Sequence, residues 1–320
     1  MNSKKTLLVA GYIGFGLLSF VVSMYLTFPA EALAQRLTQE LRRQSGGQWQ
    51  AAYTKAATYR MSGLVLSDVT FTRLADPGTA AAAAAAAAAD PGAPPRSDAP
   101  QSFKVDSLRA RLRLLPLLLG HTGLQAQAQL HSGWVHATVT PQGTGMTVEA
   151  QIKEVDLANP PLLAPFLGLP VGGKLNGSLE GRYDLDPKKM NAQLNLQLDA
   201  ATVGPGAVAG FSLPNVEVGQ VTLAAEIKEG KFKVTQFKQM GGNVSLQANA
   251  SATVRNPVDA SLMDVCCKVR ADPLFLSHNP KIKTALQLAE VQLKKDPEGY
   301  LNLPLTGPLN TMHIGNTVCR

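Results

Sequence analysis

The sequence predicts a mainly β protein with one N-terminal transmembrane helix, an antiparallel sheet and a few short helices. A charge-free apolar run near the N-terminus predicts the transmembrane helix. Alternation of apolar and polar residues with a period of two predicts strands over most of the remaining chain. Apolar residues make up 45% of the 320 residues and aromatic residues only 6%, so a core of thin aliphatic layers is expected.

The predicted anchor covers residues 6–28 (TLLVAGYIGFGLLSFVVSMYLTF), which carry no charge. As a helix this run extends about 34 Å, enough to cross the hydrocarbon core of a bilayer. Lys4 and Lys5 precede it, so the positive-inside rule places the N-terminus in the cytoplasm and the chain after Phe28 on the other side. We therefore expect residues 1–28 to be a cytoplasmic tip and an anchor. The alternative is a signal peptide cleaved after Ala34, although the apolar run is longer than such peptides usually carry.

A short amphipathic helix is expected over residues 29–47. Leucines recur there at helical spacing, and Gly46-Gly47 ends the pattern. The leucines are Leu33, Leu37 and Leu41, and the arginines of the same segment are Arg36, Arg42 and Arg43. These arginines either contact lipid headgroups or form a solvated helix face.

Residues 48–320 are expected to form one β-rich domain. Its alternating segments are separated by Gly and Pro, as in antiparallel hairpins and meanders. The clearest segments are 103–114, 124–130, 135–139, 146–152, 175–185, 192–198, 221–227 and 244–254. An earlier strand at 62–72 changes phase between Leu66 and Val69, which predicts a bulge or bend. Residues 75–100, rich in Ala and Pro, are expected to be a mobile insert.

Two segments depart from the strand pattern. Residues 159–181 are apolar and Pro-rich, and we expect a short helix there that covers an open sheet edge or, alternatively, a docking site. Residues 280–295 carry apolar side chains at helical spacing after a proline, which predicts a helix. A last strand is expected at 300–305.

No residue pattern indicates catalysis, a metal site or a cofactor. The histidines lack metal-binding spacing, and Ser178 lacks the preceding glycine of a nucleophile elbow. Neighbouring residues of a strand point to opposite faces, so at most one of Cys266 and Cys267 can readily pair with Cys319. The alternative is that all three are small buried hydrophobes or free thiols. We therefore expect a protein that is not an enzyme.

Arg109, Arg111 and Arg113 form the candidate interaction face. They alternate with apolar residues, so one face of the predicted strand is a row of cations. Such a row either binds an acidic partner or lipid headgroup, or is a solvated outer face. The net charge is +7, but the basic residues are scattered and no basic patch with interleaved aromatic residues occurs. Nucleic acid is therefore not an expected partner.

The order of these features resembles a known family. The anchor and the amphipathic helix precede a G-L-x-L-x-x-V run at 63–69, an R-L-R-L-L-P-L-L-L-G run at 111–120 and a closing P-L-T-G-P-L-N run at 304–310. In these runs the chain resembles the type II secretion system protein N family and, more distantly, the AsmA-like envelope proteins. The resemblance implies an inner-membrane protein of a Gram-negative bacterium, whose periplasmic part is an elongated, curved antiparallel sheet without enzymatic activity.

Two functions follow from the resemblance as hypotheses. In the first, the periplasmic domain is a component of the type II secretion machinery and binds other secretion-system or envelope proteins through strand edges or the arginine face. In the second, the domain is an AsmA-like lipid-binding or lipid-transfer protein whose apolar sheet face shields acyl chains. The two differ in whether protein closes the apolar face or leaves it open to a ligand. The modest length of the chain favours the first.

Overall fold

The structure is a computed structural model, and it describes residues 12, 15, 16, 19, 22, 23, 29–60, 62–74, 101–113, 123–159, 162, 163, 169–208, 211–255, 260–309, 313–315 and 319. Most of the predicted anchor at 6–28 and all of the Ala/Pro-rich insert at 75–100 lie outside these residues. Within them, no helix has the length and apolar character needed to span a membrane.

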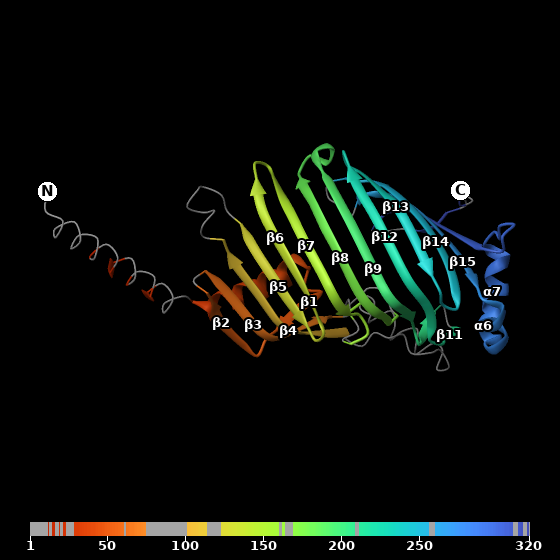
Figure 1. The fold of residues 1–320 in the computed structure, drawn as a ribbon, viewed down its shortest axis with the longest axis horizontal. Coiled ribbons are helices and arrows are strands. Elements are labelled where there is room, and N and C mark those ends of the chain that lie inside the picture. The colour runs from red at the N-terminus through yellow and green to blue at the C-terminus, as the bar shows by residue number, and fades with distance from the viewer. Residues whose placement is uncertain are drawn as a thin grey trace.

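One large antiparallel sheet of 15 strands dominates the described chain, so the mainly β prediction is confirmed (Figure 1). Its strands are β1 (Trp49–Ala52), β2 (Lys55–Tyr59), β3 (Gly63–Arg73), β4 (Gln101–Leu112), β5 (Leu124–Leu130), β6 (Gly133–Gln142), β7 (Gly145–Asp156), β8 (Val171–Asp184), β9 (Asn191–Val203), β12 (Val216–Lys228), β13 (Lys231–Met240), β14 (Val244–Thr253), β15 (Leu262–Ala271), β16 (Leu301–Pro308) and β17 (His313–Ile314). From β3 onward, spatial order follows chain order, and β1 and β2 both pair with β3. The remaining strands, β10 (Gly206–Val208) and β11 (Phe211–Leu213), form a separate hairpin.

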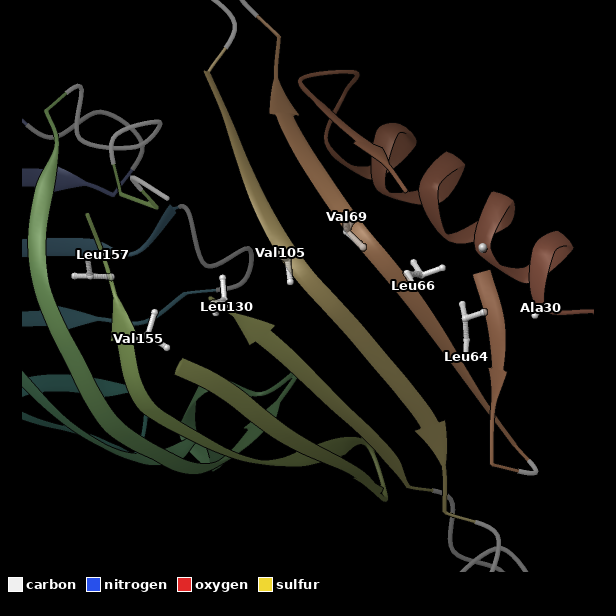
Figure 2. Packing of buried hydrophobic residues seen from close by; sticks show 9 residues of the cluster. Ala30, Leu64, Leu66, Val69, Val105, Leu130, Val155 and Leu157 are labelled. Atoms are coloured by element: carbon white, nitrogen blue, oxygen red, sulfur yellow. The ribbon is translucent and has the colours of Figure 1, made fainter. Parts of the chain in front are cut away.

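Helix α2 (Ala30–Gln44) lies within the segment expected to be helical and packs on β1, β2 and β3. It contacts the sheet through alanines, since Ala30 and Ala34 are buried while Leu33 and Leu37 remain 38% and 48% exposed. Small side chains allow the helix to approach the strands closely. Figure 2 shows α2 beside β3, at the start of a buried apolar cluster that continues across the neighbouring strands to Leu157.

A line of left-handed residues bends the sheet. Glu154 (φ 50°) on β7, Gly173 (φ 123°) on β8, Ala200 (φ 51°) on β9 and Gly219 (φ 84°) on β12 lie on neighbouring strands, and Asp68 (φ 51°) lies apart from them on β3. The pairing register shifts beside Glu154, Gly173, Ala200 and Gly219, as expected for β-bulges. In β3 the change of apolar phase between Leu66 and Val69 coincides with the left-handed Asp68, and the register with β4 does not shift there.

The left-handed residues divide β7, β8, β9 and β12 into two parts each. The short arms are residues 155–156, 171–172, 201–203 and 216–218, and the long arms are the remaining parts of these strands. The short arms are well packed, since Val155, Ala201, Val216 and Val218 are all buried, as is Leu157 directly after β7. Apolar side chains from the connection between β7 and β8 pack on the same cluster; they are Leu162 and Leu163. The long arms have far fewer buried side chains.

The expected interruption of the strands at residues 159–181 was wrong for residues 171–181, whereas β8 confirms the strand expected at 175–185. Residues 171–181 belong to β8, a strand in the middle of the sheet, and the described residues before it form turns and bends instead of a helix. Residues 160, 161 and 164–168 lie outside the described part. Among the described residues of this connection, Leu162 and Leu163 pack against the buried cluster that includes Val155 and Leu157.

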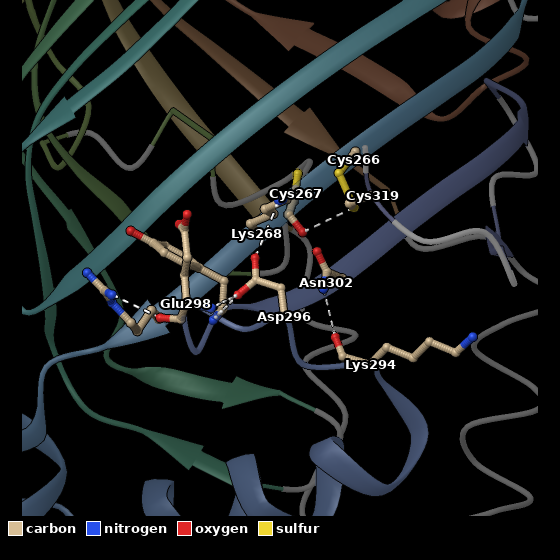
Figure 3. Close-up of polar contacts among 10 residues, drawn as sticks. Cys266, Cys267, Lys268, Lys294, Asp296, Glu298, Asn302 and Cys319 are labelled. Atoms are coloured by element: carbon tan, nitrogen blue, oxygen red, sulfur yellow. Dashed lines mark hydrogen bonds and ion pairs between the residues drawn. A yellow bond between two sulfur atoms is a disulfide. The ribbon is translucent and has the colours of Figure 1, made fainter.

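The C-terminal part contains the predicted late helix and last strand. Helix α7 (Pro280–Gln292) and β16 confirm these predictions, and a short helix α6 (Pro273–His278) precedes α7. The two helices lie at the end of the sheet opposite α2 (Figure 1). Cys266 forms a disulfide with Cys319, and Cys267, its neighbour on β15, remains a free thiol (Figure 3). One cysteine of the pair is thus bonded to Cys319, as the alternation of faces allows.

Candidate functional site

The two faces of the sheet differ sharply in chemistry. Antiparallel partners share a face, and the register places apolar residues opposite apolar ones across many strands. One row across β7, β8, β9, β12 and β13 reads Ile152, Gly177, Leu196, Leu223 and Phe237. The adjacent row, which points to the other side, reads Gln151, Ser178, Asn195, Ala224 and Gln236. The long arms therefore have one apolar face and one polar face.

We define the apolar face as the side of the sheet, from β7 to β15, that carries the row from Ile152 to Phe237. Its residues are Val148, Ala150, Ile152, Gly177, Leu179, Leu194, Leu196, Leu198, Val221, Leu223, Phe232, Val234, Phe237, Leu246, Ala248, Ala250, Val265, Cys267 and Val269. All of these are only partly buried, whereas Ala225, on the same face of β12, is buried and only 4% exposed. A second packed layer would bury such positions completely, and no described element does so.

Glycines make the floor of this face smooth along β8. A Cβ added at Gly177 would lie 2.6 Å from Leu196 Cδ2, and one added at Gly181 would lie 2.4 Å from the Ala192 Cβ. Side chains of β9 therefore occupy the space above β8. The result is a continuous aliphatic surface without large projections.

Helices cover the two ends of the sheet. Helix α2 packs at the N-terminal end, and α6 and α7 enclose a pocket of about 640 Å³ against β14, β15 and β16 at the other. The pocket's apolar lining includes Val244, Val269, Leu276, Leu286 and Leu301. Because Val269 pairs with both Leu246 and Leu301, the pocket floor is a continuation of the apolar face.

The predicted arginines lie on the polar face, where Arg109 and Arg113 are exposed and Arg111 is half-buried. The Arg109 guanidinium lies 5.6 Å from the centre of the Tyr59 ring, and Arg111 Nε donates a hydrogen bond of 2.7 Å to Gln125 Oε1. Arg113 continues the ladder through its backbone N–H, which donates to the carbonyl of Gly123. The structure thus brings the arginines to one face but on the side opposite the apolar face.

Several described side chains have shifted pKa values, among them Asp199, Asp296 and Cys267. Hydrogen bonds from Gln197 and Gln220 lower the pKa of Asp199. Burial opposes ionisation of Asp296, but hydrogen bonds from the Tyr300 N–H and the Lys268 ammonium outweigh it and lower the pKa. On the apolar face, burial raises the pKa of the Cys267 thiol. Among the described residues, no cluster of His, Cys, Asp or Glu is arranged to hold a metal ion.

Sequence reasoning did not find the pocket. The sequence does contain a signal for α6, which covers part of the pocket. Asp272 is a capping residue, and Pro273 stands at the first helical position. The comparisons with known proteins give no match to any family, to any curated protein or to any solved structure.

Proposed function

We propose that this chain binds lipid acyl chains on its apolar face, as a lipid-binding or lipid-transfer protein of the bacterial envelope. The observation that carries the proposal is the partial exposure of the apolar face from β7 to β15. A soluble protein rarely leaves so large an apolar patch uncovered unless it binds a partner, a ligand or a membrane.

The size and chemistry of the apolar face fit acyl chains. Strands lie about 4.8 Å apart, so a face of this many strands extends roughly 30 Å across the sheet. One acyl chain spans about half of a 30 Å bilayer core, or about 15 Å. Burying a Leu, Val, Ile or Phe side chain completely contributes about 1.5–3 kcal/mol, and these partly buried residues retain for a ligand only the share of this gain that belongs to their exposed surface. Flexible aliphatic chains can cover a long, smooth surface of this kind.

The predicted anchor adds a second reason. If residues 6–28 cross the inner membrane, α2 and the first strands begin directly at its periplasmic surface. The sheet that carries the apolar face would then begin at a source of lipid, with β4, β5 and β6 between its first strands and β7. The predicted localisation and the proposed ligand are therefore consistent with one another.

The hypothesis of a secretion-system component bound to other proteins remains a prediction. It was preferred on sequence because of the modest length of the chain, and the partly exposed apolar face now favours the lipid hypothesis. The two can be separated by asking what touches this face in the cell.

Site-specific photo-crosslinking in the full chain tests the proposal. A benzophenone amino acid replaces Leu196 on the apolar face in one variant and Asn195 on the polar face in the matched control. After irradiation of living bacteria, we expect phospholipid adducts by mass spectrometry at position 196 and none at 195. Protein adducts at 196 would instead support the interaction hypothesis, and equal lipid labelling at both positions would contradict the proposal.

A further inference from the structure

The pocket under α6 and α7 differs from the rest of the apolar face because charged side chains surround it. Lys283 and Glu290 come from α7, Lys295 and Gly299 follow it, and Arg270 comes from the end of β15. The floor remains aliphatic, with Val269 and Leu301 paired across β15 and β16. An apolar floor with a charged rim fits a molecule that has both an apolar and a polar part.

The charged side chains of this rim differ in whether they have a partner of opposite charge. Lys295 Nζ lies 2.9 Å from Glu290 Oε1, so these two charges compensate each other. Asp272, the other acid of the lining, uses its carboxylate to cap α6 by accepting from the Leu274 N–H at 2.7 Å. Lys283 is exposed and has no carboxylate partner among the described residues.

Arg270 adds a second cation near the same rim. A Cβ built on Gly299 would lie 3.8 Å from Arg270 Cδ and 3.9 Å from Lys295 Cε, so both side chains converge on that glycine. The guanidinium packs 4.5 Å from the centre of the Tyr300 ring and donates to the Glu298 carbonyl, which holds it in place. Its charge is not neutralised by any described carboxylate.

We propose that this pocket binds the headgroup phosphate of an anionic glycerophospholipid, with Lys283 and Arg270 as its cationic ligands and the acyl chains on the adjoining apolar face. The inference rests on the proposed lipid binding and adds to it the class of lipid and the position of its polar end. Cations at the rim of a pocket recognise a phosphate through charge-assisted hydrogen bonds, which are stronger than neutral ones.

Native mass spectrometry of the full chain in a non-ionic detergent tests this site. The probes are phosphatidylglycerol and a diacylglycerol with the same acyl chains, which lacks the phosphate. We expect Lys283→Glu to lower the affinity for phosphatidylglycerol about tenfold or more, the value of one charge-assisted hydrogen bond, and to leave diacylglycerol unchanged. Lys281→Glu is the matched control, because Lys281 is exposed on the same helix but does not line the pocket.

A second pair of variants tests the cavity itself. Leu286→Trp should fill the pocket and weaken phosphatidylglycerol binding, whereas Leu288→Trp, at a position 56% exposed and outside the lining, should not. If both lipids bind and Lys283→Glu behaves like Lys281→Glu, the headgroup site is wrong while acyl-chain binding stands. If neither lipid binds the native chain, both proposals are overturned.

Discussion

Gln239 replaces the backbone pairing that β13 and β14 lack. The strands pair only between residues 231–233 and 251–253, and beyond that point the Gln239 side chain lies between them. Its Oε1 accepts a hydrogen bond of 3.1 Å from the Leu246 N–H, and the two N–H groups of its Nε2 point among the carbonyls of Val218, Gly241 and Val244, all within hydrogen-bond distance. One amide thus joins β12, β13 and β14 where the sheet begins to separate, close to the pocket.

Gln239→Ala should therefore be strongly destabilising. The substitution leaves the Leu246 N–H and several carbonyls without their partner, and we expect the free energy of unfolding to fall by about 2–3 kcal/mol. Urea denaturation of the full chain in a non-ionic detergent, followed by fluorescence of Trp49 and Trp134, measures this loss. Gln236→Ala, an exposed position on the polar face of the same strand, is the control and should change little. Equal stability of the two variants would contradict the role given to Gln239.

The bend line predicts a second stability effect, at Gly219. This residue has φ 84°, and a Cβ there would lie 2.3 Å from the Met240 carbonyl oxygen. Gly219→Ala combines left-handed strain with a backbone clash, so we expect a loss of about 3 kcal/mol or more. Gly241→Ala has a similar φ of 76° but open space around the added Cβ, and should cost only about 1 kcal/mol. Denaturation midpoints that do not separate the two variants would show that the bend tolerates a side chain.

Asp184 should make the stability depend on acid pH. Its side chain is 2% exposed and accepts hydrogen bonds from the Asp186 N–H, Thr144 and Arg182, and the first of these contributes most to lowering its pKa below 3.8. A carboxyl group with a lowered folded pKa stabilises the protein above its unfolded pKa, and this contribution is lost as pH falls through the folded value.

Asp184→Asn is therefore expected to lower the denaturation midpoint at pH 7. The difference between the midpoints of the variant and the native chain should become smaller as the pH falls below about 4. Midpoints at pH 7, 4 and 3 check this expectation. Glu180→Gln, at an exposed position on the same strand, serves as the control. A gap that stays constant over the whole range would mean that Asp184 acts through packing instead of its charge.

Period-two alternation was sufficient to predict the long arms, because each strand there has one apolar and one polar face. It failed for β1 and β2, whose sequence WQAAYTKAATY has little alternation and whose pairing depends on β3. It also failed for the connection before β8, where an apolar, Pro-rich composition suited a helix but Leu162 and Leu163 pack on the core.

The candidate site was beyond the reach of the sequence for a different reason. A half-exposed and a fully covered sheet face have the same alternation, since both need one apolar row per strand. Only the path of the bend line and the position of α6 and α7 decide which rows are covered. The arginine row was placed correctly on one face, but its role in binding a partner stays a prediction.

The disulfide offers the last prediction. Cys266 and Cys319 are separated by 53 residues, and closing a loop of that length stabilises the folded state by about 4 kcal/mol in the chain-entropy account. Cys319→Ser should therefore lower the denaturation midpoint, and reductant should lower the native midpoint to the same value while leaving the variant unchanged. Cys267→Ser is the control, because it keeps the disulfide and should remain sensitive to reductant. A native midpoint that reductant does not move would show that the bond contributes nothing to stability.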